Sequence, residues 1–321
     1  MTNKYEIFAA AKNPVMAEKD YLECQILETL FSDEFFADNF VFAGGGSITK
    51  SYSFSPRVGQ DVDLAYGAFI DVLSTRSKKQ LNTFRKNFKT FVFDELTPRI
   101  NKIINQNGEY IILTDREQRV LHNQEQWLSS PTIHVLYRSK IAESLEDIRI
   151  EIIPRKYPSE KVSYRAVVPY SIPQLQMGNI PTIAYQQTFW DKIFALHSNS
   201  VSTKPHTDAF YSRHYFDVAI LSGHIKLVDT AKMFSDIVAY QSRYTTKNIG
   251  SDLAVRDVNL LPDDRVLYAL ESDYQQLAAR TFCGAAASWN TIVKKLEDLT
   301  KKVKDALEEV KTTGYGLVAP Q

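Results

Sequence analysis

The first half of the chain changes its hydrophobic period several times. Residues 16–37 place apolar side chains at helical spacing, and residues 40–43 form a short apolar run that ends in three glycines. The pattern therefore predicts a helix, a buried strand and a tight turn that opens a second helix. In residues 61–66 polar and apolar side chains alternate, which predicts a second strand.

The rest of the pattern places further strands before a mainly helical region. Helical spacing over residues 72–106 is followed by strand-like runs at residues 109–114, 132–138 and 148–153. Residues 171–181 contain two prolines and a glycine and mark the best domain boundary, because almost the whole pattern beyond them is helical. We therefore predict an α+β fold, with a mixed sheet flanked by helices in residues 1–175 and a mainly helical domain in residues 176–321.

The composition is that of a globular protein of 321 residues, with 44% hydrophobic and 24% charged residues. These values exclude disordered, collagen-like and coiled-coil classes. Cys24 and Cys283 are far apart and belong to no Cys/His cluster, so neither a disulfide framework nor a structural zinc site is indicated. The charged N-terminus and the lack of any apolar run of about 20 residues predict a cytoplasmic protein without a signal peptide or a membrane span.

Net charge points to no class of partner, because 38 lysines and arginines balance 38 aspartates and glutamates. Any basic surface must therefore be local. The candidates are a cluster from Arg76 to Lys89 and a lysine group from Lys294 to Lys304, and each is also explained as an ordinary solvated helix face.

Two aspartates separated by one residue are the first candidates for chemistry. On a strand, Asp61 and Asp63 project from the same face, where two carboxylates repel each other unless a cation lies between them. Such a pair at a strand end is a natural ligand set for a divalent ion such as Mg²⁺. Acidic pairs with this spacing also arise by chance, so the surrounding sequence decides between the two explanations.

The glycine turn upstream of the aspartates favours the chemical explanation. Glycines at a helix N-terminus let backbone N–H groups approach a phosphate, and the hydroxyl of Ser47 adds a donor. Taken alone, the glycines are an ordinary strand-to-helix turn and Lys50 a solvated side chain. A third carboxylate for metal-assisted phosphoryl transfer is offered by Glu151, which otherwise faces solvent between two isoleucines.

Two charged residues lie on aromatic-rich helices in the second half of the chain. Lys192 follows Phe189 and Trp190, and Asp217 follows Tyr215 and Phe216. Each side chain either reaches solvent along the helix surface or pairs with a charge in a polar cleft.

Taken in order, these residues resemble the AbiEii/AbiGii-type nucleotidyltransferase toxin family. The matching segments are Gly45 to Lys50, Arg57 to Leu64, Ile150-Glu151, Thr188 to Leu196 and Arg213 to Val218. No single motif is diagnostic, but the ordered set is far more specific than any of its members. The resemblance spans residues 40 to about 225 and has a weaker echo at residues 274–296.

The resemblance implies a polymerase-β-type nucleotidyltransferase fold, with a Mg²⁺-dependent, two-ion site in a groove that the helical domain completes. It implies that Asp61 and Asp63 bind the metal and that Glu151 and Asp217 are further active-site acids. The residues that it assigns to the nucleotide and its phosphates are Gly45, Gly46, Ser47, Lys50, Arg57 and Lys192. Many relatives have Thr in place of Ser47 and Ser in place of Gly59, so this chain lacks one hydroxyl near the carboxylates.

These implications predict an enzyme that transfers a nucleoside monophosphate from an NTP to an acceptor hydroxyl and releases pyrophosphate. The family further implies the toxin of a toxin–antitoxin or phage-defence (abortive infection) module. Its expected partners are an RNA acceptor such as the 3′ end of tRNA and an antitoxin encoded by a neighbouring gene. The alternatives are a nucleotidyltransferase that modifies a small molecule or a protein, and a catalytically silent nucleotide-binding module.

Overall fold

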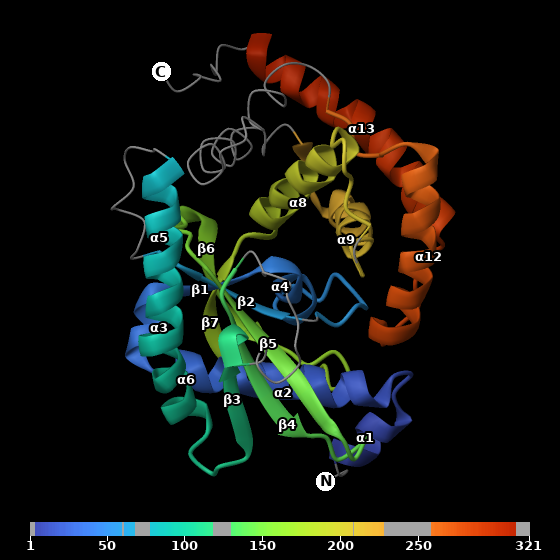
Figure 1. The fold of residues 1–321 in the computed structure, drawn as a ribbon. Helices are drawn as coiled ribbons and strands as arrows, with labels where there is room; N and C mark the ends of the chain where they lie inside the picture. Colours follow the sequence, from blue (N-terminus) through green and yellow to red (C-terminus); the bar gives the residue numbers. More distant parts are fainter. Residues whose placement is uncertain are drawn as a thin grey trace. The chain divides into compact units, whose positions relative to one another are not determined.

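The computed structural model describes residues 4–59, 61–67, 78–117, 130–207, 209–227 and 258–312 (Figure 1). The chain forms two compact units, the first comprising Met1–Ala184 with Thr281–Gly284 and the second Tyr185–Arg280 with Ala285–Gln321. The first unit thus extends beyond the predicted boundary at residue 175, because residues 177–183 form a strand of its sheet.

A mixed sheet of seven strands forms the centre of the described part of the first unit. Its order is β3-β4-β5-β2-β1-β7-β6. The strands are β1 Phe40–Ala43, β2 Asp61–Tyr66, β3 Tyr110–Thr114, β4 Thr132–Arg138, β5 Leu145–Ile153, β6 Val162–Val167 and β7 Met177–Ile183. β2 runs parallel to β5 and β1 parallel to β7, whereas the other neighbours are antiparallel. The predicted α+β class is confirmed.

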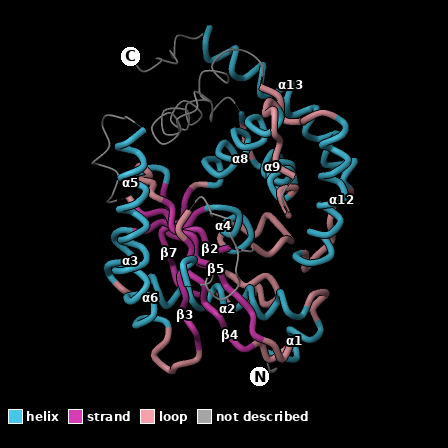
Figure 2. Tube along the Cα trace, viewed as in Figure 1, coloured by secondary structure: helices cyan, strands magenta, loops and turns pink. Residues whose placement is uncertain are grey.

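Short helices and one long helical segment accompany this sheet. The α-helices are α1 Lys4–Ala10, α2 Pro14–Phe31, α3 Glu34–Asn39, α4 Gly44–Lys50, α5 Lys78–Thr90 and α6 Thr97–Ile104, and a 3₁₀ turn covers Ser159–Lys161. A π-helical stretch, Phe91–Leu96, joins α5 to α6 in one continuous segment (Figure 2). α2 begins where the sequence favours a helix start, because Asn13 caps it and Pro14 supplies the first residue. The predicted helix over residues 72–106 is therefore confirmed from residue 78, and residues 72–77 lie outside the described ranges.

The two faces of the sheet differ in chemistry. Val62, Leu64, Ile150 and Ile152 point to one face and are completely buried. Helix α2 packs against β6 and β7, and α6 packs against β3. Because side chains alternate along a strand, Asp61, Asp63 and Glu151 point to the opposite face. This face carries most of the polar residues of β2 and β5. The apolar core thus fixes which residues are left for chemistry.

The second unit is helical in its described part. Its helices are α8 Tyr185–Ser200, α9 Arg213–Leu221, α12 Asp264–Thr281 and α13 Trp289–Thr312, with a 3₁₀ turn at Ser222–His224. α9 packs against both α8 and α13 around buried aromatic side chains that include Trp190 and Tyr215. The helices predicted at residues 188–197 and 213–221 are confirmed. Within the described ranges of both units, no helix is sufficiently long and apolar to cross a bilayer.

Candidate functional site

Strand pairing brings three acidic residues together on the polar face of the first unit. In the antiparallel pair β1–β2, Ala43 lies opposite Asp63, and in the parallel pair β2–β5, Asp63 lies beside Glu151. Asp61 shares this face because it is two residues away on the same strand. The shared face of Asp61 and Asp63, predicted from their spacing, is confirmed, and Glu151 proves to be the register neighbour of Asp63.

Gly44, in the turn that follows β1, lies directly against the Asp63 carboxylate. Its φ of +67° lies in the left-handed region that glycine adopts most readily. A Cβ atom on this residue would lie 1.6 Å from Oδ2 of Asp63. Only glycine therefore lets the backbone pass so close to the carboxylate, a requirement that the local sequence pattern does not reveal.

Helix α4 begins beside that carboxylate without a side-chain cap from its N-cap residue. Ala43 is the N-cap residue and has no side-chain acceptor to satisfy the first N–H groups of the helix. Ser47 is completely buried, and its Oγ donates a hydrogen bond of 2.8 Å to the carbonyl oxygen of Gly44. The hydroxyl of Ser47 thus closes the turn from within, while Gly44 and Gly45 are partly exposed. The backbone amides at a helix N-terminus are a preferred binding site for phosphate.

Gly59 supports the same turn from the loop that precedes β2. A Cβ atom on Gly59 would lie 3.1 Å from Cα of Gly46, and one on Gly46 would lie 3.3 Å from the carbonyl oxygen of Asp61. The two glycines therefore let the loop pack directly on α4. A serine at position 59, expected from the resemblance, would have to fit this close backbone packing.

Arg149 is the cation of the polar face, and the sequence pattern alone did not single it out. It lies beside Asp61 in the β2–β5 register, with its Nη2 2.5 Å from Oδ1 of Asp61. This Oδ1 atom is buried and accepts no hydrogen bond of good geometry within the described part of the chain, so the contact is an ion pair. A buried carboxylate oxygen of this kind fits a metal ligand. In the described ranges, however, no three acidic, His or Cys side chains converge closely enough to hold an ion.

His134 adds a second positive charge next to Arg149. The two residues are register partners in the β4–β5 pair. Nδ1 of His134 lies 2.9 Å from Oδ2 of Asp147, and its Nε2 lies 3.3 Å from Oδ1 of Asp115. Burial lowers the pKa of His134, but the hydrogen bonds and the negative charges of the two aspartates outweigh this effect and raise the pKa to about 9. His134 is therefore an imidazolium at neutral pH.

Lys50 and Arg57, the two cations expected to face phosphate, are both buried. Lys50 is 1% exposed, and its Nζ pairs with Asp20 and lies 2.7 Å from Oε2 of Glu23, both on α2. Arg57 is 2% exposed and donates from Nη1 to the carbonyl oxygen of Val58. Both side chains are thus buried in the first unit, and Lys50 is not the solvated residue of the alternative explanation. Contact of Lys50 and Arg57 with phosphate stays a prediction.

The second unit brings Lys192 of α8 and Asp217 of α9 together. Lys192 Nζ lies 2.9 Å from Oδ2 of Asp217 and 3.3 Å from Nδ1 of His214. The side chain of Lys192 is 10% exposed and that of Asp217 is completely buried. Of the two arrangements that the sequence left open, the structure shows the buried charge pair rather than a side chain that reaches into solvent.

Sequence comparison identifies the family. The model of the nucleotidyl transferase AbiEii toxin, type IV toxin–antitoxin system, matches residues 25–308. The chain therefore belongs to the AbiEii nucleotidyltransferase toxin family, and the resemblance stated from its motifs is confirmed. It is accordingly a nucleotidyltransferase, of a family that uses an NTP and a divalent metal ion and that belongs to toxin–antitoxin systems. No curated protein sequence matched the chain.

Two solved structures are similar to this chain over most of its length. JHP933 from Helicobacter pylori is 16% identical, with 91% of this chain and 96% of that chain covered and a TM-score of 0.37. MenT4, a nucleotidyltransferase toxin from Mycobacterium tuberculosis H37Rv, is 13% identical, with 95% and 96% covered and a TM-score of 0.48.

The contact between Gly44 and Asp63 leads to a prediction for Gly44→Ala. The new methyl group would occupy the position of the Asp63 carboxylate, which must then turn away from the start of α4. We expect nucleotidyl transfer to fall by about 100-fold, since the backbone donors and the carboxylate no longer share one position. Stability should fall by about 1–2 kcal/mol from the backbone strain alone, measured by urea unfolding.

Gly108→Ala is the matched control for this experiment. Gly108 has nearly the same φ, +68°, but a Cβ atom there would have no neighbour within 4 Å. The control should show the same loss of stability with normal activity. Equal activity losses in the two variants, or normal activity in Gly44→Ala, would contradict the importance of the close approach.

The charge of His134 leads to a prediction for stability at alkaline pH. Its folded pKa of about 9 lies above the ordinary histidine pKa of 6.5, so its contribution to stability is complete below pH 6.5 and is lost as pH rises to 9. We expect the free-energy difference between wild type and His134→Gln to shrink by about 2 kcal/mol over that range. Urea unfolding at several pH values measures this difference, and a constant difference from pH 6 to 9.5 would show that the pKa of His134 is not raised in the fold.

Proposed function

We propose that the enzyme transfers a nucleoside monophosphate from an NTP to an RNA hydroxyl, with Mg²⁺ held by Asp61 and Asp63. The observation that carries this proposal is the Asp63 carboxylate placed directly against Gly44, where the N-terminal amides of α4 begin. A phosphate bound by those amides lies beside the carboxylates that would hold its metal ion. Family membership supports both the NTP and the divalent ion.

Each group of this chain has a separate task in the proposal. The amides of Gly45 and Gly46 bind the triphosphate, and Ser47 keeps their turn closed through its bond to Gly44. Bound Mg²⁺ would neutralise phosphate charge and position the reacting oxygens. Arg149 neutralises Asp61 when no ion is bound, so that the two aspartates are not left to repel each other. Glu151 remains the candidate for a third acid, because it lies beside Asp63.

The distribution of positive charge supports an RNA acceptor. Helix α5 contains five cations, Lys78, Lys79, Arg85, Lys86 and Lys89, and no acidic residue. The lysines of α13 are accompanied by acidic residues on the same helix, so they form a mixed surface. A helix whose charged residues are all positive is typical of a surface that binds a phosphate backbone. We therefore favour the 3′ end of an RNA such as tRNA over a small molecule or a protein as the acceptor.

The toxin assignment also implies an antitoxin. We propose that it is encoded by a neighbouring gene, as is usual for two-gene modules, and that the module acts in phage defence. A catalytically silent protein is the alternative least supported, because the carboxylates and the glycine turn are in contact in the first unit.

The test of this proposal uses purified protein, Mg²⁺, each α-labelled NTP in turn and total cellular RNA. Wild type should label a tRNA-sized band, and Asp61→Asn and Asp63→Asn should lower labelling by more than about 100-fold because they remove the metal ligands. Mg²⁺ should also raise the melting temperature of wild type but not of these variants. Asp298→Asn, an exposed residue of α13, is the matched control and should behave as wild type.

The outcomes of this test separate the alternatives. Label in a protein or small molecule, but not in RNA, would show that the enzyme modifies that acceptor instead of RNA. Triphosphate binding without pyrophosphate release would support the silent module. Full activity in Asp63→Asn would contradict the metal site itself.

Lys192 is proposed to stabilise negative charge on the reacting phosphates. A single Lys192→Ala change leaves the completely buried Asp217 without this partner, and we expect it to cost about 3–5 kcal/mol of stability. The double variant Lys192→Met/Asp217→Leu removes both charges and should regain most of that stability, while its transfer rate stays about 100-fold below wild type. Urea unfolding and the labelling assay measure the two effects, and an active, stable double variant would show that the pair is only structural.

A further inference from the structure

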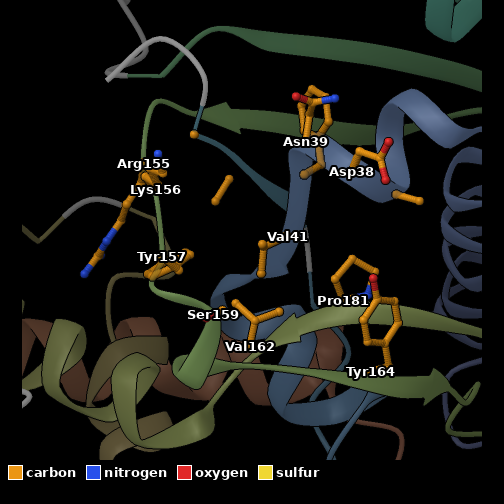
Figure 3. A pocket seen from close by; sticks show the side chains of 14 residues that line it. Asp38, Asn39, Val41, Arg155, Lys156, Tyr157, Ser159, Val162, Tyr164 and Pro181 are labelled. Carbon is orange, nitrogen blue, oxygen red and sulfur yellow. The ribbon is translucent and has the colours of Figure 1, made fainter. Parts of the chain in front are cut away.

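A cavity of about 580 Å³ opens on the first unit, on the same face of the sheet as the carboxylates. Figure 3 shows Val41 near its centre, with Arg155, Lys156 and Tyr157 to one side and Pro181 and Tyr164 to another. No residue of the site described above lines it.

Strand register fixes where this cavity lies relative to Asp63. In the β1–β2 pair, Ala43 lies opposite Asp63 and Val41 lies opposite Ala65, two residues further along each strand and on the same face. Val41 and Ala65 both line the cavity. Because a strand rises about 3.3 Å per residue, Ala65 lies about 7 Å beyond Asp63. Gly44 follows Ala43 in the opposite direction along β1. The carboxylate of Asp63 therefore lies between the helix start at Gly44 and the cavity.

The lining of the cavity has the chemistry of a nucleotide site. Among its charged residues, Arg155 and Lys156 outnumber the single acid, Asp38. The guanidinium of Arg155 lies 4.6 Å from the ring centre of Tyr157, and its backbone N–H donates to Tyr66 and Ile153, so its position is fixed. Positive charges beside aromatic rings bind the phosphates and the bases of single strands.

The opposite wall of the cavity offers a second aromatic surface. Tyr164 is 64% exposed and lies opposite Pro181 in the β6–β7 pair. Large aromatic side chains with this exposure are few on the described surface of the first unit. Its ring is available as a platform on which an unpaired base stacks.

We infer that this cavity binds the terminal nucleotide of the acceptor strand, with phosphate at Arg155 and Lys156 and the base against Tyr164. The inference rests on the proposed transfer to RNA and adds the place where the RNA end binds. Because the donor phosphates are assigned to the start of α4, an acceptor on the far side of Asp63 approaches the reacting phosphate from the opposite side. An in-line displacement requires this arrangement.

Binding of a labelled single-stranded oligoribonucleotide, measured by fluorescence anisotropy without NTP, tests the inference. Lys156→Gln should weaken binding several-fold and lower the slope of log K against log salt by about 0.7, the loss of one phosphate contact. Tyr164→Ala should weaken binding about tenfold without a change of slope, because stacking releases no counterion. In the transfer assay both variants should raise KM for RNA and leave KM for the NTP unchanged.

Two exposed residues provide matched controls. Arg165 neighbours Tyr164 but points to the opposite face, where its guanidinium lies 4.1 Å from the ring centre of Tyr52. Arg165→Gln should therefore leave RNA binding unchanged, as should Tyr268→Ala, which removes an exposed tyrosine of α12. Melting temperatures of all four variants should equal that of wild type, because every changed side chain is exposed.

Failure of this inference is distinguishable from failure of the proposed function. Normal transfer to RNA with unchanged binding in Lys156→Gln and Tyr164→Ala would overturn the inference alone. A rise in KM for the NTP instead of RNA would also overturn it and assign the cavity to the donor. Wild-type protein that binds the oligonucleotide through these residues but labels no RNA would contradict the proposed function and leave the cavity as a nucleotide-binding site.

Discussion

The close approach of Gly44 to the Asp63 carboxylate is the constraint on which the candidate site depends. Antiparallel pairing of β1 with β2 places Ala43 opposite Asp63, so the next residue of the chain must pass beside the carboxylate. The left-handed φ of Gly44 turns the chain into α4 at that point, and the missing side chain leaves the carboxylate its space. Sheet register and glycine geometry together put the N-terminus of α4 and the Asp63 carboxylate at one place.

The other end of α4 is held by a buried group of charges. Lys50, the last residue of the helix, pairs with Asp20 and Glu23 of α2. Burial lowers the pKa of Lys50, but the two acids outweigh this effect and raise it, so the ammonium persists; burial also raises the pKa of Glu23. Breaking such a group is far more costly than its net contribution to stability suggests, because it leaves a buried charge unpaired. Its consequence for function is that α4 is anchored from behind, away from its N-terminus.

The sequence predicted the parts of the fold that rest on local periodicity. β1, the glycine turn and the shared face of Asp61 and Asp63 follow from spacing alone. β6 and β7 were missed, because Gly178 and Pro181 in β7 are turn signals that strand pairing overrides. Because these two strands were missed, the boundary was expected at residue 175, whereas the first unit extends to Ala184.

The site residues were predictable to the extent that their partners are near in sequence. The burial of Lys50 could not be predicted, because its partners Asp20 and Glu23 lie on α2, about one helix and one strand upstream. The local sequence around Lys50 does not reveal this pairing. Arg149 and His134 were missed for a similar reason, since their places follow from the order of strands in the sheet. The pairing of Lys192 with Asp217, by contrast, joins two helices that the sequence had each marked by a charge among aromatic residues.

The neutral net charge, taken alone, weakens the case for an RNA acceptor. The positions of the charges in the first unit make the two compatible. The charges that cancel over 321 residues are distributed unevenly among the elements of the first unit. Asp61, Asp63 and Glu151 share one face with Arg149 and His134, whereas α5 carries only cations and the cavity two cations to one acid. A phosphate backbone responds to the charges within about a Debye length of roughly 10 Å, not to the sum over the chain. Net charge is therefore the wrong quantity for judging an RNA acceptor, and the salt dependence of binding is the right one.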